Sequence, residues 1–315
     1  MKVLLFTHKN DIDGMGSAVL SQLAFDKVDY VLCETFDINQ KVGKLYKNKK
    51  MYEYDKVFIT DLFINESLLE KIANDSNLKN KFFIFDHHKT YLDISKKYPF
   101  TTVKIDDEKG KCSATTIFYE YLVDNSLIDG WNPKIYEFCE LTRRHDTWEW
   151  KNIYNDEKSH ELALLFDSMS PDSYIDSMYE KLSDIGVVFE FNELENFLIK
   201  NKRIKIKEKL DYYLKKIYLR NILDYKAGVV FIEYEYRNEL AEYLREINYD
   251  IDFVMMISID RGTVSYRSVK DGVNVRIVAE AFNGKGHDKA STNEIDKDCL
   301  KEIVNELVKV KKLSK

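Results

Sequence analysis

Histidine and aspartate side chains directly follow three short apolar segments of this sequence. The segments are rich in bulky and β-branched residues, as is typical of buried strands, and they span residues 3–7, 57–60 and 82–85. His8 follows the first, Asp61 the second, and the triplet Asp86-His87-His88 the third. Since the carboxyl ends of parallel strands form the ligand crevice of an open α/β sheet, we expect these side chains to converge there.

The expected cluster has the composition of a metal site for phosphate chemistry. Asp11 and Asp13 come shortly after His8, and Asp146 ends a helical segment. Carboxylates with a few imidazoles and no thiolates suit Mn²⁺ or Mg²⁺, and the imidazoles favour Mn²⁺, Co²⁺ or Fe²⁺. Two such ions need a bridging ligand, for which Asp61, alone at its strand end, is the candidate. Because a metal pair of this kind activates water and stabilises phosphoryl charge, the pattern predicts hydrolysis of a phosphate ester or anhydride.

The histidines concentrate in polar segments of this type. Of the six in the chain, only His160 is expected on an ordinary helix, and the other five are His8, His87, His88, His145 and His287. This distribution favours functional roles over scattered surface histidines. Asp55, Asp106 and Asp107, in contrast, have no such neighbours and are expected to face solvent.

Composition indicates a globular protein of more than one domain. The chain has 315 residues, 44% of them hydrophobic and 32% charged. A net charge of -6 disfavours binding of long nucleic acid, so any phosphate binding must be local. The four cysteines form no CxxC pair, which argues against a zinc knuckle or a disulfide framework and fits a reducing cytoplasm. With no signal sequence and no apolar run of about 18 residues, we expect a cytoplasmic protein without a membrane partner.

Alternating strand and helix segments predict an α/β fold with a parallel sheet in the N-terminal part. We expect a first domain over 1–188, a helical linker over 189–224 and a smaller mixed α/β domain over 225–315. The Lys-rich segment 192–223 lacks Gly and Pro and predicts one long helix, whose basic side chains fit a solvated surface better than an interaction face. The last domain is expected to end in a helix over 300–310.

The sequence resembles the DHH phosphoesterases with a C-terminal DHHA1 domain over essentially its whole length. The resemblance rests on HxxDxDG at 8–14, the lone Asp61, the DHH triplet at 86–88 and RHD at 144–146, in the family's order. It implies two sets of Mn²⁺ ligands, with Mg²⁺ or Co²⁺ as alternatives: His8, Asp11 and Asp61 for one ion, and Asp13, Asp61, His87 and Asp146 for the other. Asp86 would fix the metal-binding histidines, and His88 would face the scissile phosphate as a donor or a general acid.

The C-terminal part resembles DHHA1, whose glycine-rich GGGH loop appears here as Gly284-Lys285-Gly286-His287. Adjacent glycines let backbone N–H groups approach a phosphate, and Lys285 exchanges some of that freedom for a cation. Arg267 matches a substrate-contacting arginine of the family, and a guanidinium suits a bidentate phosphate grip. The alternative for Arg267 is an ordinary arginine at a surface turn.

The resemblance predicts a Mn²⁺-dependent phosphodiesterase of the nanoRNase or oligoribonuclease type. Such an enzyme degrades short oligoribonucleotides or linear dinucleotides to nucleoside monophosphates, with one domain cutting and the other gripping the substrate and limiting its length. The absence of an OB-like segment disfavours a RecJ-like processive exonuclease. The alternatives are hydrolysis of a cyclic nucleotide or of 3′-phosphoadenosine 5′-phosphate, and a non-catalytic nucleotide sensor. A manganese pyrophosphatase fits the C-terminal part less well, and the sequence leaves open whether the chain forms a homodimer.

Overall fold

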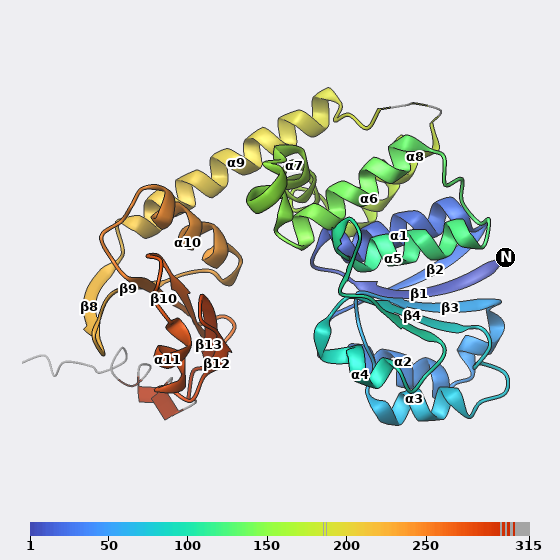
Figure 1. Ribbon diagram of the computed structural model, residues 1–315, viewed down its shortest axis with the longest axis horizontal. Coiled ribbons are helices and arrows are strands. Elements are labelled where there is room, and N and C mark those ends of the chain that lie inside the picture. Colours follow the sequence, from blue (N-terminus) through green and yellow to red (C-terminus); the bar gives the residue numbers. More distant parts are fainter. Residues whose placement is uncertain (185, 187, 297, 300, 303–304, 306–315) are drawn as a thin grey trace, which may run out of the picture. The chain divides into compact units, whose positions relative to one another are not determined.

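The computed structural model describes residues 1–184, 186, 188–296, 298, 299, 301, 302 and 305. The chain folds as two compact units, Met1–Lys202 and Arg203–Lys315 (Figure 1). The junction lies within helix α9 (Glu193–Leu214). Among the described residues, none of the helices has the length and apolar character needed to cross a membrane.

The first unit is built on a five-stranded sheet in the order β2-β1-β3-β4-β5. Its strands are β1 (Lys2–His8), β2 (Lys27–Cys33), β3 (Lys56–Thr60), β4 (Phe82–Asp86) and β5 (Thr101–Val103). All neighbouring strands pair in parallel, as the alternation of strands and helices predicted. The carboxyl ends of the strands therefore share one edge.

Helices cover both faces of this sheet (Figure 1). On one face lie α1 (Ile12–Ala24) and α5 (Ala114–Asp124), against which α6 (Pro133–Asp146) and α8 (Pro171–Ser183) pack. On the other lie α2 (Ile38–Lys47), α3 (Glu66–Ala73) and α4 (Leu92–Ser95). Shorter elements complete the unit: the helical turns η1 (Lys50–Glu53), η2 (Lys89–Tyr91) and η3 (Trp150–Tyr154), the hairpin β6 (Asp106–Asp107) and β7 (Gly110–Lys111), and α7 (Glu157–Phe166).

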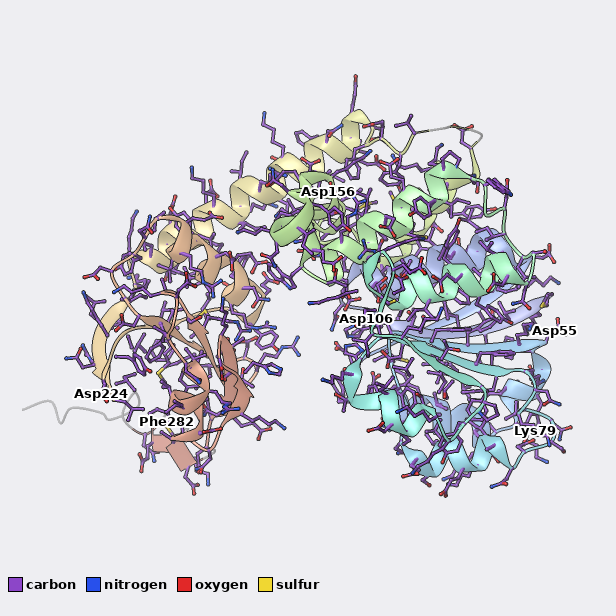
Figure 2. The ribbon with its side chains drawn as sticks, viewed as in Figure 1. Asp55, Lys79, Asp106, Asp156, Asp224 and Phe282 are labelled. Atoms are coloured by element: carbon purple, nitrogen blue, oxygen red, sulfur yellow. The ribbon has the colours of Figure 1, made fainter. Side chains whose placement is uncertain are left out.

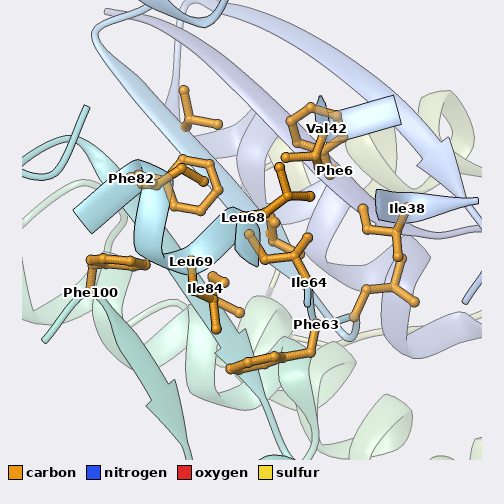
Figure 3. Close-up of a cluster of buried hydrophobic side chains, with 14 of the residues drawn as sticks. Phe6, Ile38, Val42, Phe63, Ile64, Leu68, Leu69, Phe82, Ile84 and Phe100 are labelled. Atoms are coloured by element: carbon orange, nitrogen blue, oxygen red, sulfur yellow. The ribbon is translucent and has the colours of Figure 1, made fainter. Parts of the chain in front are cut away.

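Alternating side chains of β4 divide between these two layers. Phe82 and Ile84 belong to the core cluster beneath α2 and α3, which Figure 3 shows. Phe85 points the other way and packs on Phe118 of α5, with ring centroids 5.5 Å apart. Burying a Phe or Ile side chain contributes about 1.5–3 kcal/mol, so both faces of this strand hold it in place. The polar triplet that follows thus extends from a rigid strand.

The second unit is a mixed six-stranded sheet in the order β12-β13-β11-β10-β9-β8. Its elements are β8 (Tyr218–Ile222), β9 (Tyr225–Phe231), η4 (Tyr234–Tyr236), α10 (Arg237–Glu246), β10 (Phe253–Ser258), β11 (Thr263–Ser268), α11 (Val275–Glu280), β12 (Lys285–His287) and β13 (Ala290–Glu294). Leu240 and Leu244 of α10 pack with Val254 on one sheet face. Val275 and Val278 of α11 pack with residues of the opposite face. The two helices thus lie on opposite faces of the sheet.

The C-terminal part differs from two of the expectations. The predicted helix over 192–223 is wrong after Leu214, because 218–222 form strand β8, which turns through Leu223 (φ +52°) and pairs with β9. Cross-strand pairing overrides the helical spacing there. The expected glycine-rich loop is instead the edge strand β12. The helix predicted over 300–310 falls mostly outside the described residues.

Candidate metal centre

Strands β1, β3 and β4 end at the same level of the first sheet. Thr7 pairs with Thr60, and Thr60 pairs with Phe85, so His8, Asp61 and Asp86 follow in one row. The sequence argument for convergence at the carboxyl edge predicted this arrangement.

The candidate ligands come together in three groups. In each group every residue has one nitrogen or oxygen atom that lies within 4.8 Å of those of the other members. The groups are His8, Asp11 and Asp61; Asp13, His87 and Asp146; and Asp61, Asp86, His87 and His88. Asp11 reaches the first group as the N-cap of α1, and Asp146 reaches the second as the last residue of α6. The first group contains the residues of one implied ligand set, and the second contains those of the other set except Asp61.

Asp61 joins the groups because its two carboxylate oxygens face different histidines. Its Oδ2 lies 3.3 Å from His8 Nδ1, and its Oδ1 lies 3.4 Å from His87 Nε2. The side chain is nearly inaccessible to solvent, with 4% of the residue exposed. A carboxylate in this position would suit a ligand shared by two cations.

The backbone of Asp61 adopts the left-handed conformation, with φ +57°. A non-glycine residue held in this region costs on the order of 1 kcal/mol, a cost that recurs at functional sites. The Asp61 N–H donates to the carbonyl of Phe85, which fixes the conformation against β4. The sheet thus compensates for local strain at the residue shared by both groups.

Asp13 is fully buried and is held by the N-terminus of α5. Its carboxylate accepts the N–H groups of Ala114 (2.7 Å) and Thr115 (2.8 Å). The helix N-terminus favours negative charge there. Oδ2 of the same carboxylate lies 3.7 Å from His87 Nε2.

Gly14, the glycine of the HxxDxDG motif, permits close approach of α1 to β1. A Cβ at this position would lie 2.0 Å from the carbonyl oxygen of His8. The Gly14 N–H also donates to Asp11 Oδ1 and so begins the helix. The motif therefore combines candidate ligands with a glycine that lets α1 pack this closely against β1.

Burial and mutual proximity shift the pKa values of the cluster. Burial lowers the pKa of His8, but hydrogen bonds to Asp11 and Asp61 outweigh it and raise that pKa to about 11. For His87, burial is likewise outweighed by Asp61 and by the charges of Asp13 and Asp146, and the pKa rises to about 10. Burial and the charge of Asp11 raise the pKa of Asp61 to about 6. In the metal-free protein, protons on His8 and His87 therefore offset the negative charge of the clustered carboxylates. Such a cluster suits the binding of cations.

Several buried atoms of the cluster lack hydrogen-bond partners within the protein. They are Nε2 of His87, Oδ2 of Asp146 and Oδ2 of Asp86. His87 Nε2 lies 3.4 Å from Asp146 Oδ2, close but not hydrogen-bonded. Buried polar atoms are normally satisfied, so converging unsatisfied nitrogen and oxygen atoms fit a divalent cation.

Asp86 orients the two histidines that follow it. Its Oδ1 accepts the N–H groups of His87 (2.7 Å) and His88 (3.1 Å) and lies 2.7 Å from His88 Nδ1. This contact raises the pKa of His88. The imidazole uses Nδ1 toward Asp86, which leaves Nε2 for another group, and its side chain is 52% exposed. His88 thus has the setting of a proton donor.

His145 does not belong to the polar cluster, contrary to the sequence interpretation. It lies in the last turn of α6 and stacks with Trp150 and His160, at centroid distances of 6.2 and 5.9 Å. Burial and the charge of His160 lower its pKa to about 4. His145 is therefore a neutral packing residue, while its neighbour Asp146 faces His87.

A buried ion-pair network next to Asp146 escaped the sequence analysis. Arg143 is 1% exposed and pairs with Glu140 (3.0 Å) and, closely, with Glu149 (2.5 Å). It also donates to the carbonyl of Lys111 in β7. Glu140 and Arg143 are three residues apart and therefore share one helix face, which could have indicated an ion pair. Such spacing is also common on solvated helices, so it does not identify a buried pair.

The substrate-binding residues implied by the resemblance lie in the second unit. In one row across the sheet, Arg267 of β11 pairs with Ala290 of β13, which pairs with His287 of β12. Arg267 therefore occupies a strand rather than a surface turn. Gly286 has φ +148°, and a Cβ there would lie 2.5 Å from Ser291 Cα, so this glycine is needed for close strand packing. Lys285, with its side chain exposed, shares a sheet face with His287.

The acids expected to face solvent do so. Asp55, Asp106 and Asp107 are exposed, and Figure 2 labels the first two on the first unit.

Comparison with known proteins agrees with the geometry. Residues 2–141 match the model of the DHH family, N-terminal domain. The chain is 31% identical over 309 residues to oligoribonuclease NrnB of Bacillus subtilis, covering 97% of this chain and 76% of that protein.

Solved structures of low sequence identity share the fold. The pGpG-specific phosphodiesterase PggH of Vibrio cholerae matches with a TM-score of 0.55 at 13% identity, covering 98% of this chain and 97% of that one. The exonuclease RecJ bound to manganese matches with a TM-score of 0.57 at 12% identity, covering 97% and 89%. Taken with the sequence relationship to NrnB and the convergence of the motif residues at one sheet edge, these findings show that the chain belongs to the DHH family of phosphoesterases.

Proposed function

We propose that this protein is a Mn²⁺-dependent phosphodiesterase that hydrolyses short oligoribonucleotides or linear dinucleotides to nucleoside monophosphates. The observation that carries the proposal is the position of Asp61, whose two oxygens face His8 and His87 in separate ligand groups. Hydrolysis at a phosphodiester suits such a two-cation site. The relative NrnB is named an oligoribonuclease, and the structural neighbour PggH a pGpG-specific phosphodiesterase, which supports short substrates.

We assign the ligands as the sequence motifs do. His8, Asp11 and Asp61 would hold one ion, and Asp13, Asp61, His87 and Asp146 the other. Two bound Mn²⁺ ions would supply an activated water and neutralise charge on the phosphoryl group. Mg²⁺ or Co²⁺ would serve with the same oxygen and nitrogen donors.

The protein's own contribution to the reaction centres on Asp86 and His88. Asp86 holds His88 through Nδ1, so the exposed imidazole can donate from Nε2 to the departing oxygen of the scissile bond. Since Asp86 also raises the pKa of His88, the proton needed for this step is retained at higher pH.

The second unit would bind the substrate through its basic sheet face. Arg267, Lys285 and His287 share this face, and Gly284 and Gly286 shape the strand that carries two of them. The buried free thiols of Cys33, Cys112 and Cys139 suit a reducing compartment, so we assign the protein to the cytoplasm.

The proposal is tested with the full-length protein and Mn²⁺ on end-labelled RNA of two to about twenty-four nucleotides. Single-stranded DNA, a cyclic dinucleotide, 3′-phosphoadenosine 5′-phosphate and pyrophosphate serve as competing candidates. We expect rapid cleavage of the shortest RNA, with rates that fall as length increases. Turnover of another phosphate alone would refute the substrate assignment, and nucleotide binding without any turnover would favour a sensor.

Asp61→Asn and Asp106→Asn form a matched pair for this assay. Both substitutions remove one carboxylate charge, but Asp106 is exposed and absent from the ligand groups. We expect hydrolysis to disappear in the first variant and to persist in the second.

A further inference from the structure

A stacked aromatic pair joins the loops that follow β3 and β4. Phe63 lies two residues after Asp61, and Tyr91 lies three residues after His88. The two rings are nearly parallel, with centroids 4.5 Å apart and an interplanar angle of 8°. Aromatic pairs at this separation stabilise each other beyond the effect of burial. The stack therefore links the loop of the candidate shared ligand to the loop of the candidate proton donor.

The core of the first unit holds this pair in place. Phe63 is 5% exposed and belongs to the core cluster beneath α2 and α3, in which Figure 3 labels it. Tyr91 is partly buried and packs against the same cluster. As the last residue of η2, Tyr91 also donates its N–H to the carbonyl of His88 at 3.0 Å. This short turn brings the tyrosine back beside the histidine, so the core extends to the edge of the candidate metal centre.

The ring of Tyr91 contacts the imidazole of His88. Their centroids are 6.4 Å apart, and the interplanar angle of 73° makes this an edge-to-face contact. Burial and the charge of Asp86 raise the pKa of Tyr91, so the phenol is neutral and makes this contact as an uncharged ring. Asp86 holds the same imidazole through Nδ1, at 2.7 Å. Since one hydrogen bond leaves a side chain that is 52% exposed free to tilt, the second contact narrows the directions in which Nε2 can point.

The position of this imidazole relative to the metal ligands affects its use as a proton donor. His88 Nδ1 lies 3.9 Å from Asp61 Oδ1, and the rings of His87 and His88 are 4.5 Å apart. A general acid must lie within hydrogen-bond reach of the oxygen that it protonates. A displacement of 1 Å can cost on the order of a hundredfold in rate. A residue that fixes the ring beside Asp61 therefore contributes to the rate without touching the substrate.

We propose that Tyr91 is a positioning residue, which holds the imidazole of His88 beside Asp61 through its stack on Phe63. Tyr91 acts through His88 and does not itself transfer a proton. Its ring carries this role rather than its hydroxyl, because the stack and the edge-to-face contact are both made by the ring. Neither aromatic residue belongs to the motifs or the ligand groups of the site. The inference rests on the proposed function for the reaction that it serves, but not for the geometry of the imidazole.

Kinetics of the full-length protein with Mn²⁺ test this role on two substrates. A dinucleotide releases a nucleoside oxygen that needs a proton, whereas thymidine 5′-(p-nitrophenyl phosphate) releases p-nitrophenolate, which leaves without one. We expect Tyr91→Leu to lower kcat on the dinucleotide about tenfold with little change in KM, because part of the general-acid contribution is lost. The rate on the p-nitrophenyl ester should change little. Tyr91→Phe keeps the ring and should retain the wild-type rates on both.

A double variant separates positioning from a general loss of structure. If Tyr91 acts through His88, Tyr91→Leu should have no further effect in a His88→Gln background. The matched control is Tyr46→Leu in α2, another partly buried tyrosine that packs against the same core cluster. It should leave kcat on both substrates unchanged, and thermal melts should show all variants folded.

Nuclear magnetic resonance in EDTA tests the contact itself without turnover. Isotope-labelled histidine rings give one signal for each of the six histidines, and His88→Gln identifies its own by removing it. That signal should shift in Tyr91→Leu and stay in place in Tyr91→Phe. A rise in KM alone, equal losses on both substrates, additive losses in the double variant or an unmoved signal would each overturn the inference. If the signal responds as expected but the wild type hydrolyses neither substrate, the proposed function fails and the positioning of the imidazole by Tyr91 stands.

Discussion

Replacing Asp61 by asparagine should abolish metal-dependent hydrolysis and yet stabilise the metal-free protein. Burial and the charge of Asp11 raise the pKa of Asp61 from 3.8 to about 6. The folded protein therefore binds this proton more tightly than the unfolded chain does, and its stability falls as pH rises from 3.8 through about 6. At about 1.4 kcal/mol for each unit of pKa, the loss above pH 6 is about 3 kcal/mol.

Asparagine removes this loss because it stays neutral at every pH. It also tolerates the left-handed backbone of position 61, so no new strain is expected. In EDTA at pH 8 we expect Asp61→Asn to raise the melting temperature by about 6–12 °C, and the advantage to vanish at pH values below the ordinary carboxyl pKa. Asp106→Asn should change the melting temperature little, because Asp106 is exposed.

Addition of Mn²⁺ should cancel most of the variant's advantage in stability. An ion that binds only the folded wild type at a hundred times its Kd adds about 2.7 kcal/mol, a gain that a variant lacking the shared ligand would not have. Thermal melts over a Mn²⁺ series, in parallel with hydrolysis of a labelled dinucleotide, make both measurements. A variant that is less stable than the wild type in EDTA at pH 8 would refute the electrostatic argument, and one that still hydrolyses with Mn²⁺ would refute the bridging role.

Three further predictions follow from the same geometry. Mn²⁺ binding at pH 7 should release about two protons, because the pKa values of His8 and His87 are about 11 and 10 in the metal-free protein; titration calorimetry in buffers of different ionisation enthalpy counts them, and no release would contradict the assignment. His88→Gln should lower kcat at least a hundredfold with little change in KM, since the proton donor acts only in the transition state; a rise in KM alone would give His88 a binding role. Gly286→Ala should destabilise the protein by about 2 kcal/mol, because its Cβ would meet Ser291 at 2.5 Å; urea unfolding measures this, and an unchanged midpoint would contradict it.

The parts of the fold that could be predicted are those whose local signal agrees with the tertiary structure. The strand at 82–86 has apolar residues on both faces, which predicts that it is buried. The polar triplet at its end predicts that the strand leads to the edge of the sheet where ligands bind. Asn65 and Ser113 cap their helices by accepting backbone hydrogen bonds, a role that these side chains commonly have. In these segments the secondary-structure propensity, the hydrophobic pattern and the positions of the polar residues all favour the same structure.

The errors occur where distant pairing decides the structure. Residues 218–222 have helical spacing, but a partner strand, β9, is available next to them. His145 was assigned to the polar cluster because of its neighbours in the sequence, whereas the helix turns it toward Trp150. Such relations depend on contacts that a single sequence does not encode locally.

The hydrogen bonds from the N-terminus of α5 to Asp13 also bear on the order of folding. Asp13 and Ala114 are separated by 101 positions, so this contact closes a long loop, and we expect it to form late in folding. A folding intermediate that lacks docked α5 would keep β1 and its neighbours but would leave Asp13 without its backbone donors. Tight metal uptake would then be one of the last events of folding, and the rate at which it appears would report on completion of the native topology.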